Sequence, residues 1–167
     1  MKARDLLVYA AGCGLFFAAI PAGMVYLGLR YPVTFVPPGR LAAAVGAATS
    51  GCGLFFTLWA NLELYRKGGG GPAVIGRIRL MTETCRLVTS GPYALCRNPM
   101  HLGLILFYLG LSCALNSLYS LLITFLFWIF AFCFAVFLDE PRLRRDFGAE
   151  YEDWAARVPR FWPRTRK

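Results

Sequence analysis

The chain has 167 residues, 57% of them hydrophobic, and its mean hydropathy is +0.52. A composition this apolar excludes an ordinary soluble domain. The formal net charge is +9, but the basic residues lie between and outside the apolar runs and form no single basic stretch. We therefore interpret the charge as membrane topology and reject nucleic-acid binding.

Four apolar runs are expected to cross the membrane, because about 20 apolar residues span a bilayer as a helix. They cover approximately 6–29, 41–64, 100–115 and 118–138, and the third is short. Asn116-Ser117 indicates a tight turn, so the third and fourth runs should form a helical hairpin. With both termini inside, only Arg30 and Arg40 face outward, as the positive-inside rule favours. We therefore expect an integral, multi-pass membrane protein whose active face lies on the cytoplasmic side.

We predict one all-α polytopic membrane domain with four transmembrane helices, a cytoplasmic-face cofactor pocket and a C-terminal interfacial helix. Its expected parts are an N-terminal hairpin over 5–65, a cytoplasmic loop over 66–98, a second hairpin over 99–138, and an amphipathic helix with a tail over 139–167. The glycine run at 68–71 predicts a flexible linker or a mobile cover over a cofactor. The segment 73–86 is expected to be irregular or a short helix.

Two further features concern the end of the chain. Pro141 is expected to stop the fourth helix directly after two acidic residues. Beyond it, Phe147, Tyr151, Trp154 and Val158 recur at helical spacing. This stripe predicts an amphipathic helix on the bilayer surface, and it also fits a lid that folds back on a site.

A turn, a charge and a helix start fall together in the stretch 87–103. Gly91-Pro92 indicates a turn. Asn98 followed by Pro99 is typical of an N-cap and a first helical position. Arg97 stands directly before this helix start, whose unpaired backbone N–H groups favour an anion. The sequence therefore predicts an anion site at this point.

Asp139 and Glu140 close the fourth apolar run, where two carboxylates oppose the helix dipole and require a cation. Because a hairpin brings the start of the third helix to the end of the fourth, Arg97, Asn98 and His101 should face this acidic pair. A pocket with an anion site beside a cation site suits a small zwitterionic cation such as S-adenosylmethionine. Gly103 would allow close approach of the backbone.

Several short motifs combine into a more specific pattern. The chain resembles the superfamily of integral membrane methyltransferases that joins isoprenylcysteine carboxyl methyltransferases to phospholipid N-methyltransferases. The matching residues are Leu87-Val88, Gly91-Pro92-Tyr93, Arg97-Asn98-Pro99-Met100-His101-Leu102-Gly103, Asp139-Glu140-Pro141, Phe147-Gly148, Tyr151 and Val158-Pro159.

The resemblance implies S-adenosylmethionine as cofactor and a lipid-like or small hydrophobic acceptor that enters sideways from the bilayer. It places Leu87, Val88 and Tyr93 along the adenosine portion and Glu140 on the amino group. Arg97, Glu140 and His101 are the catalytic candidates. The cofactor-binding candidates are Leu87, Val88, Tyr93, Asn98, Pro99, Met100, His101, Gly103, Asp139 and Glu140.

The acceptor stays open between a phospholipid amine, a prenylcysteine carboxylate and a hydrophobic thiol. The isoprenylcysteine branch carries an arginine one turn before its acidic residue, where this chain has Val136, which argues against carboxyl methylation. An amine acceptor must lose a proton, with His101 or Glu140 as candidate acceptors, although a capping or packing histidine is the simpler interpretation. The six cysteines predict neither a disulfide framework nor a metal site.

The sequence is also compatible with two other classes of protein. Membrane sterol reductases, which use NADPH, look similar in the tail from Phe147 to Pro159. A non-enzymatic scaffold would merely neutralise the acidic pair with Arg142, Arg144 and Arg145. The sequence does not give the oligomeric state.

Overall fold

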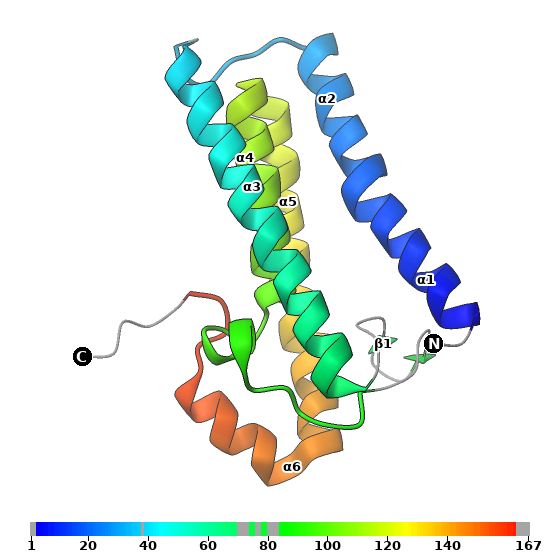
Figure 1. The fold of residues 1–167 in the computed structure, drawn as a ribbon. Coiled ribbons are helices and arrows are strands. Elements are labelled where there is room, and N and C mark those ends of the chain that lie inside the picture. Colours follow the sequence, from blue (N-terminus) through cyan, green and yellow to red (C-terminus); the bar gives the residue numbers. More distant parts are fainter. Residues whose placement is uncertain (1–2, 38, 70–73, 76–77, 80–83, 163–167) are drawn as a thin grey trace.

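Helices make up most of this computed structural model, which describes residues 3–37, 39–69, 74–75, 78–79 and 84–162. Three of them, α3, α4 and α5, pack side by side, and a fourth rod made of α1 and α2 leans away from them toward its α1 end (Figure 1). The main helices are α1 (Ala3–Gly14), α2 (Ile20–Arg30), α3 (Arg40–Glu63), α4 (Pro99–Leu115), α5 (Leu118–Phe134) and α6 (Glu140–Arg157).

Short elements join or extend these helices. Wider π-helical turns are η1 (Leu15–Ala19), η2 (Leu64–Gly68) and η4 (Ala135–Asp139), and η3 (Gly91–Ala94) is a 3₁₀ turn. The segment expected to be irregular or helical instead contains an antiparallel pair of two-residue strands, β1 (Val74–Ile75) and β2 (Ile78–Arg79). Gly69 ends η2 with a φ of 70°. The rest of the predicted glycine linker lies outside the described residues.

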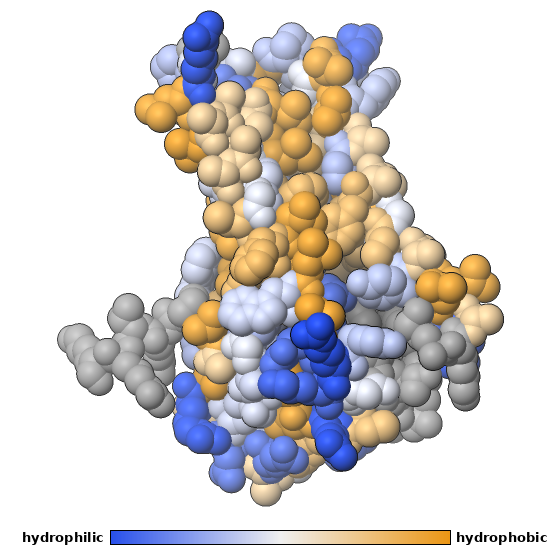
Figure 2. Space-filling view, in the orientation of Figure 1, coloured by the Kyte–Doolittle hydropathy of each residue, from blue (hydrophilic) through white to orange (hydrophobic). Residues whose placement is uncertain are grey.

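Three helical stretches are long and apolar enough to cross a membrane: Ala3–Arg30, Arg40–Gly68 and Leu118–Arg157. Apolar side chains cover the middle of the bundle, and hydrophilic ones gather at both ends, most of them at the end that carries α6 (Figure 2). The predicted helical, integral membrane fold is confirmed. α4 is apolar but has only 17 residues, about 26 Å at 1.5 Å per residue, so the count of four crossings stays a prediction.

Small residues allow α3 and α4 to pack backbone to backbone. A Cβ on Gly53 would collide with α4 near Phe107, and one on Gly46 would lie 2.5 Å from the backbone nitrogen of Ala114. Gly103 and Gly110 of α4 face α3 in the same way. Within a bilayer, helices associate through such close packing rather than through the hydrophobic effect. Gly46 and Gly53 therefore lie on the face of α3 that packs against α4.

The turn between α4 and α5 is the one that the sequence predicts. Asn116 has a φ of 45°, and the Ser117 hydroxyl accepts a hydrogen bond from Ser120 N at 3.3 Å. The Asn116 side chain also holds the loop before α3, because its amide donates to Val36 O at 2.8 Å and its oxygen accepts from Phe35 N at 3.3 Å. The hairpin of α4 and α5 is thus confirmed.

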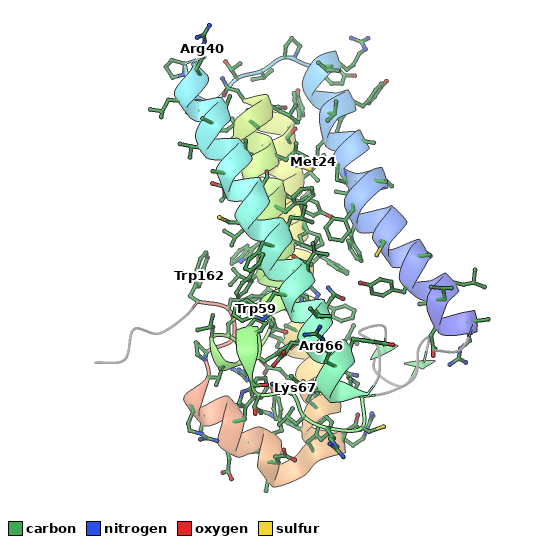
Figure 3. The ribbon with its side chains drawn as sticks, viewed as in Figure 1. Met24, Arg40, Trp59, Arg66, Lys67 and Trp162 are labelled. Atoms are coloured by element: carbon green, nitrogen blue, oxygen red, sulfur yellow. The ribbon has the colours of Figure 1, made fainter. Side chains whose placement is uncertain are left out.

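The first rod is attached to α4 and α5 by hydrogen bonds to its backbone. Pro21 has no N–H for the carbonyl four residues before it, and the helix widens there into η1, where Ile20 N–H donates to Leu15 O. Tyr108 donates to Phe16 O at 2.7 Å, and Ser120 donates to Met24 O at 3.0 Å. Met24, completely buried, points from α2 toward the other helices (Figure 3).

The expectation that Pro141 stops the fourth helix is wrong. The helical backbone continues without a break from α5 through η4 into α6, and the wider π-helical turn η4 directly precedes Pro141, which has no N–H to donate. Glu140 therefore lies within a continuous helix, where its backbone N–H donates to Ala135 O. The amphipathic helix is confirmed, but it bends at Gly148 (φ 50°, ψ −124°), and its apolar face packs against protein, as the lid interpretation requires.

Candidate functional site

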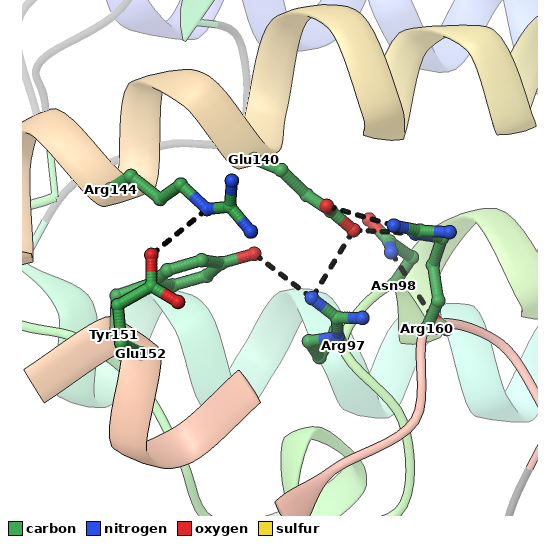
Figure 4. A network of polar contacts seen from close by, with 7 residues as sticks. All are labelled: Arg97, Asn98, Glu140, Arg144, Tyr151, Glu152 and Arg160. Atoms are coloured by element: carbon green, nitrogen blue, oxygen red, sulfur yellow. Dashed lines mark hydrogen bonds and ion pairs between the residues drawn. The ribbon is translucent and has the colours of Figure 1, made fainter. Parts of the chain in front are cut away.

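Arg97 and Glu140 meet at the end of the bundle, as the hairpin predicts. The Arg97 NH1 atom lies 3.2 Å from Oε1 of Glu140, and the Glu140 side chain is only 9% exposed. Arg97 ends the loop before α4, whereas Glu140 follows η4 at the start of α6 (Figure 4). A buried carboxylate needs such a partner, because desolvation otherwise disfavours its charge.

Arg160, which the sequence analysis did not single out, is the second partner of Glu140. Its Nε and NH2 atoms donate to Oε1 and Oε2 of Glu140 at 2.5 and 3.0 Å. Such a bidentate pair fixes direction as well as charge. The hydrogen bonds that Arg160 donates to Glu140 raise the pKa of its guanidinium above the ordinary value. Arg160 therefore stays charged at any physiological pH.

The backbone around Arg160 covers the start of α4. Arg97 N–H donates to Pro159 O at 2.8 Å and Asn98 N–H donates to Arg160 O at 3.2 Å. The Asn98 side chain precedes Pro99 as predicted but does not cap α4; its amide donates to Arg160 O at 3.1 Å. The backbone N–H groups directly before the predicted anion site thus face carbonyl oxygens of the tail.

Tyr151 extends the network into α6. Its hydroxyl accepts a hydrogen bond from Arg97 NH1 at 3.2 Å, and its side chain is completely buried. On the outer side of α6, Arg144 and Glu152 form an exposed ion pair at 3.0 Å (Figure 4). Tyr151 therefore links the charged residues to the apolar residues of α6.

The acidic pair does not behave as the scaffold interpretation requires. Asp139 does pair with Arg142, at 3.3 Å. Arg145, however, pairs with its neighbour Asp146, and Arg144 pairs on the outer side of α6. The partners of Glu140 come instead from the loop before α4 and from the tail.

The residues expected along an adenosine group do come together. Val88, Tyr93, Tyr151 and Trp154 are buried in one cluster with Ala60 of α3, and Leu87, Met100, Phe147 and Val158 pack against it. Burial raises the pKa of the Tyr93 phenol well above its ordinary value, so this phenol stays neutral. We call this set the α6 cluster. Through Tyr151 it adjoins the paired side chains of Arg97, Glu140 and Arg160, which we call the charged network.

Two predicted site residues pack against neighbouring helices. The His101 ring packs against Phe134 with centroids 5.6 Å apart, and it has no hydrogen-bond partner among the residues that the structure describes. The absent side chain of Gly103 faces α3, because a Cβ there would collide with Thr57. Helix packing alone therefore explains why a glycine occupies position 103. The assignments of His101 and Gly103 to the cofactor site stay predictions.

A second polar group fastens the loop before η3 to the end of α3. Glu63 pairs with Lys67 at 2.7 Å, and Ser90 donates to the same Glu63 oxygen at 2.7 Å. Lys67 in turn donates to Ser90 Oγ at 2.8 Å. Gly91, with a φ of 60°, follows at once and turns the chain toward Arg97.

Cys96 precedes Arg97 and is completely buried. Burial raises the pKa of its thiol to about 11. A thiol with that pKa is protonated at neutral pH and is a poor nucleophile. Cys96 is therefore a packing residue of the core and not a reactive one.

The fold and the site define a class: helical membrane proteins with a buried, charge-paired site at one end of the bundle. The phospholipid methyltransferase family matches residues 41–150, which run from α3 into α6. The chain belongs to this family. The predicted kinship with integral membrane methyltransferases is thereby confirmed.

Two curated relatives match part of the chain. The cobalt-zinc-cadmium resistance protein CzcN of Cupriavidus metallidurans is 39% identical over 79 residues, which are 47% of this chain and 36% of that protein. The nickel-cobalt-cadmium resistance protein NccN of Alcaligenes xylosoxydans xylosoxydans is 30% identical over 116 residues, or 64% of this chain and 53% of the relative. The chain thus spans about half or less of these relatives. No solved structure matches it significantly.

Proposed function

We propose that this protein is an S-adenosylmethionine-dependent membrane methyltransferase that acts on a lipid-like or small hydrophobic acceptor. The observation that carries the proposal is the burial of Glu140 between two guanidinium groups, in a chain of the phospholipid methyltransferase family. A buried carboxylate next to an apolar aromatic cluster combines the two environments that this cofactor requires.

The residues present fit the cofactor's groups. Glu140 would hold the ammonium, and Arg97 with the amide of Asn98 would hold the carboxylate. The α6 cluster, with Leu87, Val88 and Tyr93, would take the adenosine portion. In this structure Arg160 donates to both oxygens of Glu140. Binding of the cofactor's ammonium to Glu140 therefore requires Arg160 to share or release these oxygens.

When bound, the cofactor supplies an electrophilic methyl group on its sulfonium. The protein's own contribution is to orient the acceptor in line with that group and to exclude water. An amine acceptor must first be deprotonated, and His101 or Glu140 would accept the proton. A thiolate or carboxylate needs no base. Arg97, fixed by Glu140 and Tyr151, would hold the pocket in shape or orient the acceptor.

A lipid-like acceptor agrees with the surface of α5. Phe130 and Phe132 are 48% and 39% exposed there, and the Arg160 guanidinium lies over the Phe132 ring at 5.6 Å. The outer face of α5 is thus apolar up to the charged network. We infer that the acceptor enters sideways from the bilayer. Val136 offers no charge to an acceptor carboxylate, so an amine or a thiol is favoured.

The site is assigned to the cytoplasmic side. Arg66 and Lys67 lie at the end of the bundle that carries the site, and Arg40 lies at the opposite end (Figure 3). The site end holds more basic residues, which the positive-inside rule assigns to the cytoplasm. Trp59 and Trp162 lie at similar heights in this view, toward the end that carries Arg66 and Lys67, and interfacial aromatic residues concentrate near the ends of membrane helices.

Ligand-dependent stabilisation of the detergent-solubilised protein tests the cofactor. A ligand that binds only the folded state raises the melting temperature. We expect S-adenosylhomocysteine, the product, to do so and NADPH not to; the reverse order would identify a reductase. Glu140→Gln should abolish the shift, while Glu150→Gln, an exposed residue of the same helix, should retain it.

Transfer of a labelled methyl group to a total membrane-lipid extract tests the acceptor. We expect label in a lipid fraction, and separation by headgroup would identify the accepting group. Label that appears only on a soluble or volatile product would refute sideways entry from the bilayer.

A further inference from the structure

Trp154 carries a buried hydrogen-bond donor that no described residue satisfies. The residue is 4% exposed, and its indole Nε1 is inaccessible to solvent and has no acceptor among the residues that the structure describes. Leaving such a donor unpaired costs about 1–3 kcal/mol, and buried polar groups in native proteins are nearly always paired. An unpaired indole N–H in the α6 cluster therefore requires an explanation.

Among the described residues, the buried polar side chains of the membrane-spanning bundle have hydrogen-bond partners. Within the membrane-spanning bundle, Tyr108 and Ser120 donate to backbone carbonyls, and Ser112 and Thr124 bond each other at 2.9 Å. The unsatisfied buried atoms among the described residues are Trp154 Nε1 and the Nε atoms of Arg97 and Arg142, all near the charged network. Unsatisfied donors thus gather where the site is and not where the helices pack.

Tyr151 contacts two of the residues that carry these donors. Its hydroxyl accepts from Arg97 on one side, and its ring meets the Trp154 ring edge to face at 5.7 Å on the other. Trp154 shares its cluster with Val88 and Tyr93, the residues assigned to the adenosine portion. Its N–H therefore belongs to the apolar half of the site, where adenosine offers ring nitrogens and ribose oxygens as acceptors.

We propose that Trp154 is a cofactor-binding residue whose indole N–H donates a hydrogen bond to an acceptor atom of the adenosine portion. The inference rests on the proposed function, because it assumes S-adenosylmethionine as the ligand. It adds a contact from α6 to those predicted for the loop before α4. In this arrangement α6 covers the cofactor and also donates a hydrogen bond to it.

Indole ¹⁵N–¹H spectra test this contact directly. The chain has four tryptophans, so the labelled full-length protein in detergent gives four indole signals, and Trp154→Phe identifies the one from Trp154. With saturating S-adenosylhomocysteine we expect this signal to move downfield, as a new hydrogen bond requires. The signal of Trp128, which lies on the exposed face of α5, should stay in place.

Affinity gives a second measurement. Trp154→Phe keeps an aromatic ring and removes the N–H, and we expect its Kd for S-adenosylhomocysteine to rise about fivefold, the scale of one net hydrogen bond. Trp128→Phe should bind like the unsubstituted protein. A melting temperature measured without ligand shows whether Trp154→Phe remains folded.

The outcomes separate this inference from the proposed function. If S-adenosylhomocysteine binds and shifts other signals while the Trp154 signal stays unchanged, the inference is overturned and the proposed function stands. If the ligand produces neither spectral change nor stabilisation, the proposed function fails and the inference fails with it.

Discussion

Arg160 holds both carboxylate oxygens of Glu140, through contacts of 2.5 and 3.0 Å. These residues stand at the two ends of the segment that contains α6, so their pairing closes that segment into a loop on the end of the bundle. The same Arg160 offers its carbonyl oxygen to Asn98. It thus presents a cation to Glu140 and an acceptor oxygen to the start of α4, the same two groups that the amino-acid end of S-adenosylmethionine would present.

Replacing the Arg160 guanidinium should therefore strengthen ligand binding and destabilise the unliganded protein. In Arg160→Gln, the ligand's ammonium no longer competes for Glu140. We expect the Kd of S-adenosylhomocysteine to fall about fivefold, or ~1 kcal/mol, the upper range for a partly exposed ion pair. The melting temperature without ligand should fall, because α6 loses its closing contact. Calorimetry and thermal unfolding measure the two effects.

Arg157→Gln is the matched control, since Arg157 is exposed and donates to Asp153 O within α6. It should change neither quantity. If Arg160→Gln weakens binding, Arg160 supports the bound state instead of competing with it.

The meeting of Arg97 and Glu140 could be predicted because the hairpin leaves little freedom. A two-residue turn at Asn116-Ser117 forces α4 and α5 to run antiparallel, so residues before the first helix must face residues after the second. The helical periodicity of residues 147–158 likewise predicts a helix with one apolar face. These features depend on local sequence and short connections.

Other features depend on contacts that no local pattern encodes. The tail places Arg160 on Glu140 only because α6 bends at Gly148 and returns, and the single basic residue within Val158-Pro159-Arg160 was the available signal. Pro141 follows the π-helical turn η4, and the helix continues through it instead of ending. Gly103 was assigned to a cofactor, although a glycine facing α3 looks the same in sequence.

Gly103→Ala should destabilise the bundle strongly. A Cβ at Gly103 would collide with Thr57 and lie 2.8 Å from Gly53 O, and backbone cannot yield as a flexible side chain does. We expect a loss of about 1–3 kcal/mol, the usual cost of overpacking a core. Gly51→Ala in α3 has nothing within 4 Å of its new Cβ and should be neutral. Unfolding in mixed detergent compares them; equal stabilities would contradict the packing of α3 on α4.

Tyr108→Phe should loosen the first rod. The substitution keeps the ring and deletes the hydrogen bond to Phe16 O in η1, which spans 2.7 Å. Hydrogen bonds between membrane helices contribute about 0.6 kcal/mol on average, and we expect a loss of about 1 kcal/mol because Tyr108 is completely buried. Faster amide exchange in α1 and α2 than in α4 would show that the loss is local. Tyr119→Phe, at an exposed position of α5, is the control, and uniform exchange would contradict the prediction.

Gly148→Ala tests whether the bend in α6 serves the site. Gly148 has a φ of 50° and a ψ of −124°, a conformation that side-chain-bearing residues rarely adopt, while nothing lies within 4 Å of a new Cβ. Backbone strain is thus the whole effect, at about 1–3 kcal/mol. Relief of that strain by straightening α6 would withdraw Tyr151 and Trp154 from Val88 and Tyr93. We expect a lower melting temperature and a smaller shift with S-adenosylhomocysteine, whereas Ala149→Gly should reduce stability alone. A full ligand shift in Gly148→Ala would mean that the bend does not position the cofactor site.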